Sequence, residues 1–219
     1  MKICIPIKVK NMRTALEKLA EAEQKADMTE IWLDQIENLN LEEIFKHRTK
    51  PILAVCKNPE EMGSFQGDNF DKINLFTKFI ELGGEYVDIS DLHNIDFLKT
   101  YKNSCSFQII YSFHDFIKTP TFMNLSNIID QAVNTEIDMI KIATRVKDAY
   151  DIQTLEKCVA KILEVNKKPI VLGMDHLGKR TRLGKGLFQN NYLTFAALSE
   201  EEKTASGQIT INEIIDFKL

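Results

Sequence analysis

The sequence predicts an α/β fold of the (β/α)8 TIM barrel class, formed as a single domain over residues 1–219. Eight apolar, strand-like runs alternate with segments of helical periodicity, and a chain of 219 residues suits one such barrel. The turn after the first run contains no glycine, whereas a doubly wound sheet that binds nucleotides usually has a glycine-rich turn there. No low-complexity linker divides the chain, which favours one domain over two.

Each expected element follows from the spacing of its apolar residues, which alternate in strands and recur every three to four residues in helices. Leu16, Leu19 and Ala22 share one face of the first helix, and Asn124 is expected to cap the fifth. Residues 183–191 are expected to form a mobile loop. The expected strands are 3–7, 29–34, 51–56, 85–89, 106–111, 138–143, 169–173 and 192–198. The expected helices are 11–23, 41–47, 71–82, 95–102, 124–134, 149–165 and 211–217.

The composition excludes several classes of protein. A net charge of −4, from 28 basic and 32 acidic residues, argues against nucleic acid as a partner. No apolar run approaches the roughly 20 residues of a membrane span, and the opening residues form a strand pattern instead of a signal peptide. Cys4, Cys56, Cys105 and Cys158 form no CxxC pair, so neither a zinc site nor a disulfide framework is indicated. Reduced thiols of this kind are typical of a cytoplasmic protein.

Lys141 is the most informative residue, because it interrupts an apolar run from Asp138 to Thr144. A core strand rarely carries lysine, since an ammonium group is costly to remove from water. Desolvation lowers the pKa of such an amine, and a neutral amine can attack a ketone to form a Schiff base. The alternative is a lysine at a strand end whose stem packs against the core while its head reaches water.

His114 follows another strand-like run, 107–111, and histidine transfers protons readily near neutral pH. One helix separates this run from the run that carries Lys141, so in a parallel sheet the two strands are neighbours. Both side chains are then expected at the same mouth of the barrel.

Further polar and apolar residues fall at or beyond the carboxyl ends of expected strands, where barrel enzymes gather their catalytic groups. Together they would suit a small anionic ketone. They are Glu30, Lys57, Glu61, Met174, Arg182 and Gln208.

Four segments resemble the type I 3-dehydroquinate dehydratases, the Schiff-base enzymes of the shikimate pathway, in order along nearly the whole chain. Ser112-Phe113-His114-Asp115-Phe116 resembles the run that carries the catalytic histidine of that family, and 138–143 resembles the run that carries its lysine. The interval between the two residues, 141 − 114 = 27, also fits. Residues 173–182 resemble the segment with the carboxylate-binding arginine, and 204–208 resemble the lid.

The resemblance implies dehydration of 3-dehydroquinate to 3-dehydroshikimate by a cytoplasmic, homodimeric barrel enzyme that needs no metal and no organic cofactor. Lys141 would form an imine with the ketone, and His114 would remove one proton and donate another. Glu61 would orient His114, and Arg182 would pair with the substrate carboxylate. The other substrate-binding residues implied are Glu30, Lys57, Thr204 and Gln208, with Met174, Phe113 and Phe195 as an apolar wall.

The chain departs from the family pattern at four positions, one of which, Thr204 in place of a lid serine, keeps the hydroxyl. Trp32 stands where the second strand usually has an arginine, and Lys57 replaces the arginine that usually ends the third. Ser206 replaces a lid proline, which would loosen that loop. Recognition of the substrate hydroxyls is therefore open. Trp32 could pack in the core while a residue elsewhere in the chain takes over its part.

Two other functions fit the same residues. One is a Schiff-base aldolase that cleaves a different ketone, which the Trp32 and Lys57 departures favour slightly. The other is a non-catalytic sensor of shikimate-pathway ligands, against which the retention of Lys141, His114 and Glu61 argues.

Overall fold

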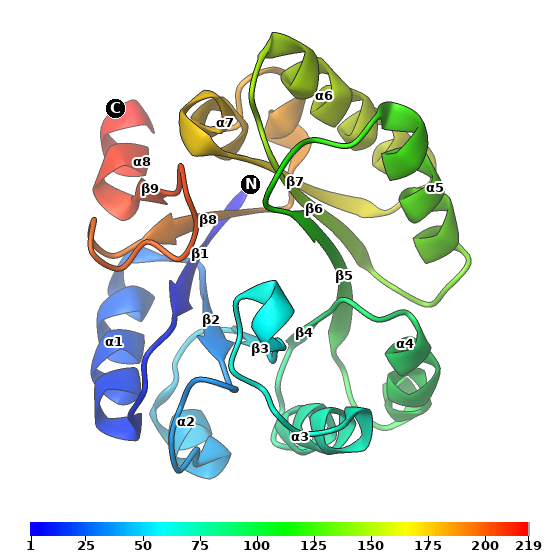
Figure 1. The fold of residues 1–219 in the computed structure, drawn as a ribbon. Coiled ribbons are helices and arrows are strands. Elements are labelled where there is room, and N and C mark those ends of the chain that lie inside the picture. The colour runs from blue at the N-terminus through cyan, green and yellow to red at the C-terminus, as the bar shows by residue number, and fades with distance from the viewer. Residues whose placement is uncertain (219) are drawn as a thin grey trace. The chain divides into compact units, whose positions relative to one another are not determined.

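A computed structural model describes residues 1–218 of the chain, in which strands alternate with helices as the sequence predicts. The chain divides into two compact units. One is Cys4–Ile109, and the other comprises Met1–Ile3 and the residues from Ile110 onward. In each unit, helices lie against one face of the strands (Figure 1).

The strands of the Cys4–Ile109 unit pair in parallel and in chain order. These strands are β1 (Lys2–Ile7), β2 (Met28–Trp32), β3 (Ile52–Val55) and β4 (Tyr86–Ile89). The helices are α1 (Met12–Lys25), α2 (Leu41–His47), η1 (Pro59–Glu61), α3 (Asn69–Glu81), α4 (His93–Leu98) and η2 (Lys99–Asn103).

The two faces of this sheet differ in chemistry, because successive side chains of a strand point to opposite faces. Ile31, Ala54 and Val87 are apolar and almost completely buried, as the face beneath the helices requires. Trp32 and Asp88 are both in register with Val55 of β3, so they share the opposite face of the sheet. Polar side chains therefore gather on the face that the helices leave uncovered.

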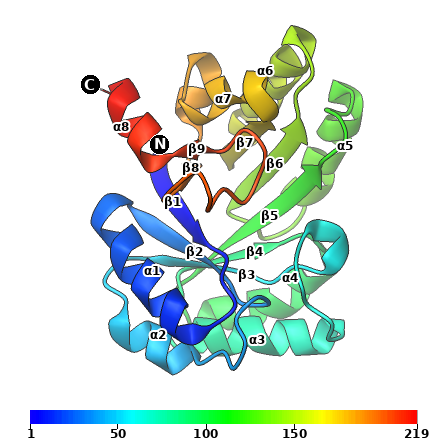
Figure 2. The ribbon, with the colours of Figure 1, turned by 60° about the vertical axis from the view of Figure 1, so that its left-hand side comes forward.

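The strands of the other unit are also parallel. The order β5–β6–β7 is set by regular pairing from Ile110 to Met174, and β9 pairs with β8 (Figure 2). These strands are β5 (Gln108–Asp115), β6 (Met139–Arg145), β7 (Lys168–Met174), β8 (Leu193–Ala197) and β9 (Ile209–Thr210). The helices are α5 (Phe122–Val133), α6 (Ala149–Glu164), α7 (Asp175–Arg182), η3 (Gly186–Asn190) and α8 (Ile211–Lys218).

Helix α7 is absent from the sequence prediction, because it is short, strongly polar and interrupted by Gly178. In the folded protein, that glycine allows the helix to pack closely on the neighbouring strand. A Cβ atom at Gly178 would lie 2.3 Å from the carbonyl carbon of Gly173, so only glycine lets α7 pack this closely on β7.

The expected cap of the fifth helix is wrong by one turn. Helix α5 begins at Phe122, and the side chain of Thr121 caps it by accepting a hydrogen bond from the backbone N–H of Asn124 at 3.4 Å. Threonine and asparagine both suit a cap, and the local pattern alone does not decide between them.

Residues 183–191 are fixed by tertiary contacts, contrary to the expected mobile loop. Phe188 is fully buried, and Asn191 uses its amide to bond both backbone groups of Val171, at 2.9 and 2.8 Å. Among residues 1–218, no helix is both long and apolar enough to cross a bilayer.

Candidate active site

Lys141 and His114 lie on the same face of the β5–β6 pair. Lys141 is in register with Ser112, and His114, two residues further along β5, is in register with Ala143. Strands rise about 3.3 Å per residue, so the two side chains start about 7 Å apart along the strand direction. This separation lets an amine and an imidazole act on neighbouring atoms of one small molecule.

Lys141 is buried, with a relative exposure of 7%. Its Nζ atom lies 4.4 Å from the centre of the Phe195 ring. Met174 and Phe195, both expected to form an apolar wall, are each 5% exposed. The expectation for Phe113 is wrong, because Phe113 pairs with Ile142 and so points to the opposite face from Lys141.

Arg182 is the last residue of α7 and is almost completely buried. Its Nε atom donates to the carbonyl of Gly173 at 3.3 Å, and its own carbonyl accepts from Thr194 Oγ1 at 2.9 Å. Burial lowers the pKa of the guanidinium to about 10, so the group remains charged at neutral pH. A buried, fixed cation of this kind suits a carboxylate ligand.

The segment that resembles a lid is held by its own side chains. Gln208, which is 1% exposed, accepts hydrogen bonds at Oε1 from the backbone N–H of Thr204 at 2.6 Å and from Thr204 Oγ1 at 3.1 Å. Gly207 has φ of +71°, and a Cβ there would lie 2.3 Å from the carbonyl oxygen of Asp175. The turn therefore packs directly on the start of α7.

Ser206 fastens this turn instead of loosening it. Its hydroxyl donates to Asp175 Oδ1, and its carbonyl accepts from the Asp175 backbone N–H at 3.1 Å. Arg145 Nε donates to the other oxygen of the carboxylate, Asp175 Oδ2, at 2.6 Å. The Ser206 bond, followed by the Arg145 interaction, lowers the pKa of Asp175.

The Cys4–Ile109 unit carries a second polar group, built around Lys57. Lys57 Nζ lies 2.8 Å from Asp88 Oδ1 and 3.4 Å from Glu61 Oε1, while Ser90 Oγ donates to Glu61 Oε2 at 2.9 Å. Lys57 is 3% exposed and Asp88 is fully buried. The charge on Lys57 is thus balanced by carboxylates of its own unit.

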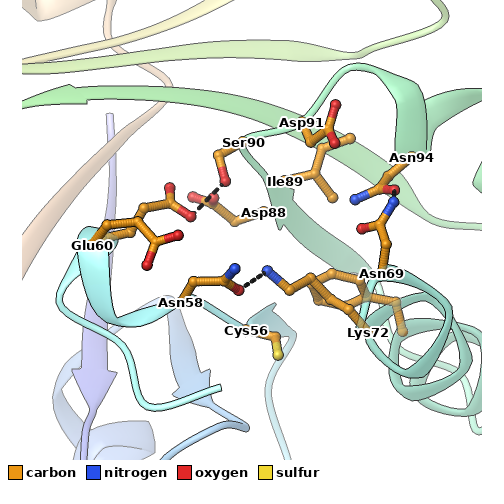
Figure 3. A pocket seen from close by; sticks show the side chains of 12 residues that line it. Cys56, Asn58, Glu60, Asn69, Lys72, Asp88, Ile89, Ser90, Asp91 and Asn94 are labelled. Atoms are coloured by element: carbon orange, nitrogen blue, oxygen red, sulfur yellow. Dashed lines mark hydrogen bonds between the residues drawn. The ribbon is translucent and has the colours of Figure 1, made fainter. Parts of the chain in front are cut away.

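Glu61, Asp88 and Ser90 border a cavity of about 350 Å³ at the ends of β3 and β4, with Asp88 and Ser90 directed into it (Figure 3). This volume is at the lower end of the range for small-molecule sites. Its wall carries more carboxylates than cations, so it suits hydroxyl donors better than an anion. Its lining residues are Cys56, Asn58, Glu60, Glu61, Asn69, Lys72, Phe76, Asp88, Ile89, Ser90, Asp91 and Asn94.

Glu30 is held by the residue that replaces the expected arginine. Trp32 Nε1 donates to Glu30 Oε1 at 2.8 Å, and the Trp32 side chain is only half-buried, so it is not a core residue. Lys8, just beyond the end of β1, places its ammonium 4.2 Å from the centre of the Trp32 ring.

Three polar groups near these sites were missed by sequence reasoning. Asp88 and Ser90 alternate with apolar residues at the end of an expected strand. The same pattern, a polar residue in an expected strand, is what singled out Glu30. Lys8 follows the first strand, and nothing in the sequence distinguishes it from the nearby Lys10. No group of three or more His, Cys, Asp or Glu side chains among residues 1–218 is arranged to hold a metal ion.

Comparison with known proteins places this chain in a family. Residues 3–217 match the family model described as Type I 3-dehydroquinase. The 3-dehydroquinate dehydratase of Methanocaldococcus jannaschii is 31% identical over 219 residues, which cover 97% of this chain and 95% of that protein. The enzyme of the same name from Methanococcus vannielii is 32% identical over 220 residues, covering 97% and 96%.

A longer relative and a solved structure complete the comparison. The chloroplastic bifunctional 3-dehydroquinate dehydratase/shikimate dehydrogenase of Arabidopsis thaliana is 28% identical over 98% of this chain, which spans 36% of that protein. The crystal structure of 3-dehydroquinate dehydratase from Geobacillus kaustophilus HTA426 superposes with a TM-score of 0.88 at 23% identity, covering 99% of this chain and 89% of that one. This likeness confirms the predicted fold class.

Proposed function

Because this chain belongs to the type I 3-dehydroquinase family, we propose that it dehydrates 3-dehydroquinate to 3-dehydroshikimate through a Schiff base on Lys141. The predicted family and the predicted enzyme class, a 3-dehydroquinate dehydratase of the shikimate pathway, are confirmed by the comparisons. The roles of individual residues are proposals, and so is the extent of the catalytic domain over residues 1–219.

One observation supports the chemistry most directly. A buried lysine and a half-buried histidine share one face of adjacent parallel strands, separated by one step of the side-chain alternation. An amine that attacks a ketone and a base that removes a proton from the adjacent carbon need this separation.

The proposed reaction has three stages: imine formation, elimination of water and hydrolysis of the imine. Lys141 Nζ adds to the C3 ketone and water leaves, which forms an iminium that draws electrons from C2. His114 removes a proton from C2, and the electron pair forms the C1–C2 double bond as the C1 hydroxyl departs. His114 returns its proton to that hydroxyl, and water then hydrolyses the imine to release product and Lys141.

The binding residues divide by charge. Arg182 is a buried cation and would pair with the substrate carboxylate. Glu30 and Lys57 would contact hydroxyl groups, and Glu61 would orient His114. The remaining proposed contacts are Thr204 and Gln208 from the lid, with Met174 and Phe195 as the apolar wall.

The protein is further proposed to act in the cytoplasm as a homodimer that binds no nucleic acid. Four free cysteines, Cys4, Cys56, Cys105 and Cys158, are typical of a reducing compartment, and the net charge of −4 disfavours a nucleic-acid surface. Sedimentation equilibrium over a range of protein concentrations tests the dimer, and a constant monomer mass contradicts it.

The decisive experiment combines two signals from one incubation with 3-dehydroquinate. Growth of the enone absorbance reports dehydration, and borohydride in a parallel sample reduces the iminium to a stable amine that mass spectrometry maps. Product with an adduct on Lys141 supports the proposal. An adduct without product points to another ketone, and the absence of both signals favours a ligand sensor.

A further inference from the structure

The ammonium of Lys8 is held in a defined position beside Glu30. Its Nζ atom donates to the carbonyl oxygen of Met62 at 2.6 Å and stands 4.2 Å from the centre of the Trp32 ring. An ammonium group has three N–H donors. The Met62 carbonyl takes one and the ring face can attract a second, so one donor stays available for a ligand.

The charge of Lys8 is less closely balanced than that of Lys57. Among residues 1–218, no carboxylate lies within ion-pair distance of its Nζ atom. Partial burial lowers the pKa of Lys8, while the more distant Asp34 and Glu30 carboxylates raise it. Lys57, the neighbouring cation, differs because Asp88 lies 2.8 Å from its ammonium.

The register of β1 and β2, continued one residue past the end of β1, puts Lys8 on the polar face of its sheet. Pro6 is in register with Glu30, and Lys8 and Trp32 each follow two residues later. Two residues is the repeat of side-chain direction in a strand, so Lys8 points the same way as Glu30 and Trp32. The cation–ring contact agrees with this placement.

We propose that Lys8 is a substrate-binding residue that donates a hydrogen bond to a substrate hydroxyl oxygen, with Glu30 accepting the hydrogen of that hydroxyl. Trp32 orders both partners, since its indole N–H bonds Glu30 and its ring face holds the Lys8 ammonium. This inference rests on the proposed function and adds the residue that recognises a hydroxyl group.

A purely structural role predicts a different result. Met62 follows Glu61, so Lys8 could serve only to anchor the loop that carries that proposed positioning carboxylate. Loss of an anchor would lower kcat through Glu61, whereas loss of a substrate contact raises KM.

The test compares Lys8→Met, which keeps the stem but removes the charge, with Lys8→Arg and with Lys10→Met at an exposed site nearby. A charge-assisted hydrogen bond predicts a rise in KM of about ten- to hundredfold for Lys8→Met. We expect kcat to stay within about threefold, because the bond is made in ground and transition states alike. Lys8→Arg should recover most of the loss, and Lys10→Met should match the parent.

The 4-deoxy and 5-deoxy analogues of 3-dehydroquinate identify the contact. The Lys8→Met penalty should disappear with the analogue that lacks the hydroxyl bound by Lys8. An unchanged KM, or a fall in kcat at constant KM, overturns the inference. A parent protein that produces no enone contradicts the proposed function instead, so the two failures are distinct.

A second measurement needs no variant. Acetylation of the native protein by an activated ester, mapped by mass spectrometry, should slow at Lys8 when product is saturating and proceed unchanged at Lys10. Equal acetylation of Lys8 with and without product contradicts the inference even where Lys8→Met does not fold.

Discussion

Lys57 Nζ and Asp88 Oδ1 lie 2.8 Å apart, and the two residues are 3% and 0% exposed. The pair joins the segment just beyond β3 to strand β4 on the polar face of the sheet. A buried pair of this kind is costly to break from one side, because the remaining charge stays desolvated.

Replacing Asp88 with alanine is therefore expected to lower the free energy of unfolding by about 3 kcal/mol. Urea denaturation followed by circular dichroism measures the change. Glu17→Ala, which removes an exposed partner of Arg13, is the matched control and should change stability very little. A loss below about 1 kcal/mol for Asp88→Ala would show that Glu61 alone can balance Lys57.

Lys141→Ala is expected to abolish turnover while substrate still binds, because no other residue is proposed to form the imine. Enone absorbance measures turnover, and isothermal titration calorimetry measures binding. Lys147→Ala, at an exposed lysine beyond the same strand, is the control. Activity within about tenfold of the parent would remove Lys141 from the mechanism.

His114→Ala should still form the imine but eliminate water about 10² to 10⁴ times more slowly, as expected for loss of a general acid–base. Borohydride trapping under substrate saturation measures the imine, and single-turnover absorbance measures the elimination. Failure to trap any adduct would contradict the separation of roles between His114 and Lys141.

Ser206→Ala should release the lid turn from Asp175, since the Ser206 bond is the first cause of the lowered Asp175 pKa. Carbon-detected NMR titration of the Asp175 carboxyl should show the pKa rising toward its ordinary value in the variant. Because the folded-state pKa is lowered, the carboxylate stabilises the protein above about pH 4, and this contribution is lost as pH falls through the lowered pKa. An unchanged titration would mean that Arg145 alone sets it.

The sequence by itself determined the alternation of strands and helices, and it singled out Lys141 and His114. Both signals are local: the periodicity of apolar residues reports which side of an element is buried, and a lysine within an apolar run is conspicuous without its neighbours. The likeness of four short segments to one family rests on the same kind of local information, and the comparisons confirm that family.

Only the tertiary structure decided which side chains meet. Three contacts join residues far apart in sequence. They are the ion pair of Lys57 with Asp88, the cation–π contact of Lys8 with Trp32 and the hydrogen bond of Ser206 to Asp175. Strand register decides the first two contacts, because a shift of one residue reverses the face of every side chain. The third depends on the packing of the 204–208 turn on the start of α7. Helix α7 could not be predicted from sequence for a related reason. Glycine has a low helix propensity, so Gly178 by itself argues against a helix. The close packing of Gly178 against Gly173 is what requires glycine at that position.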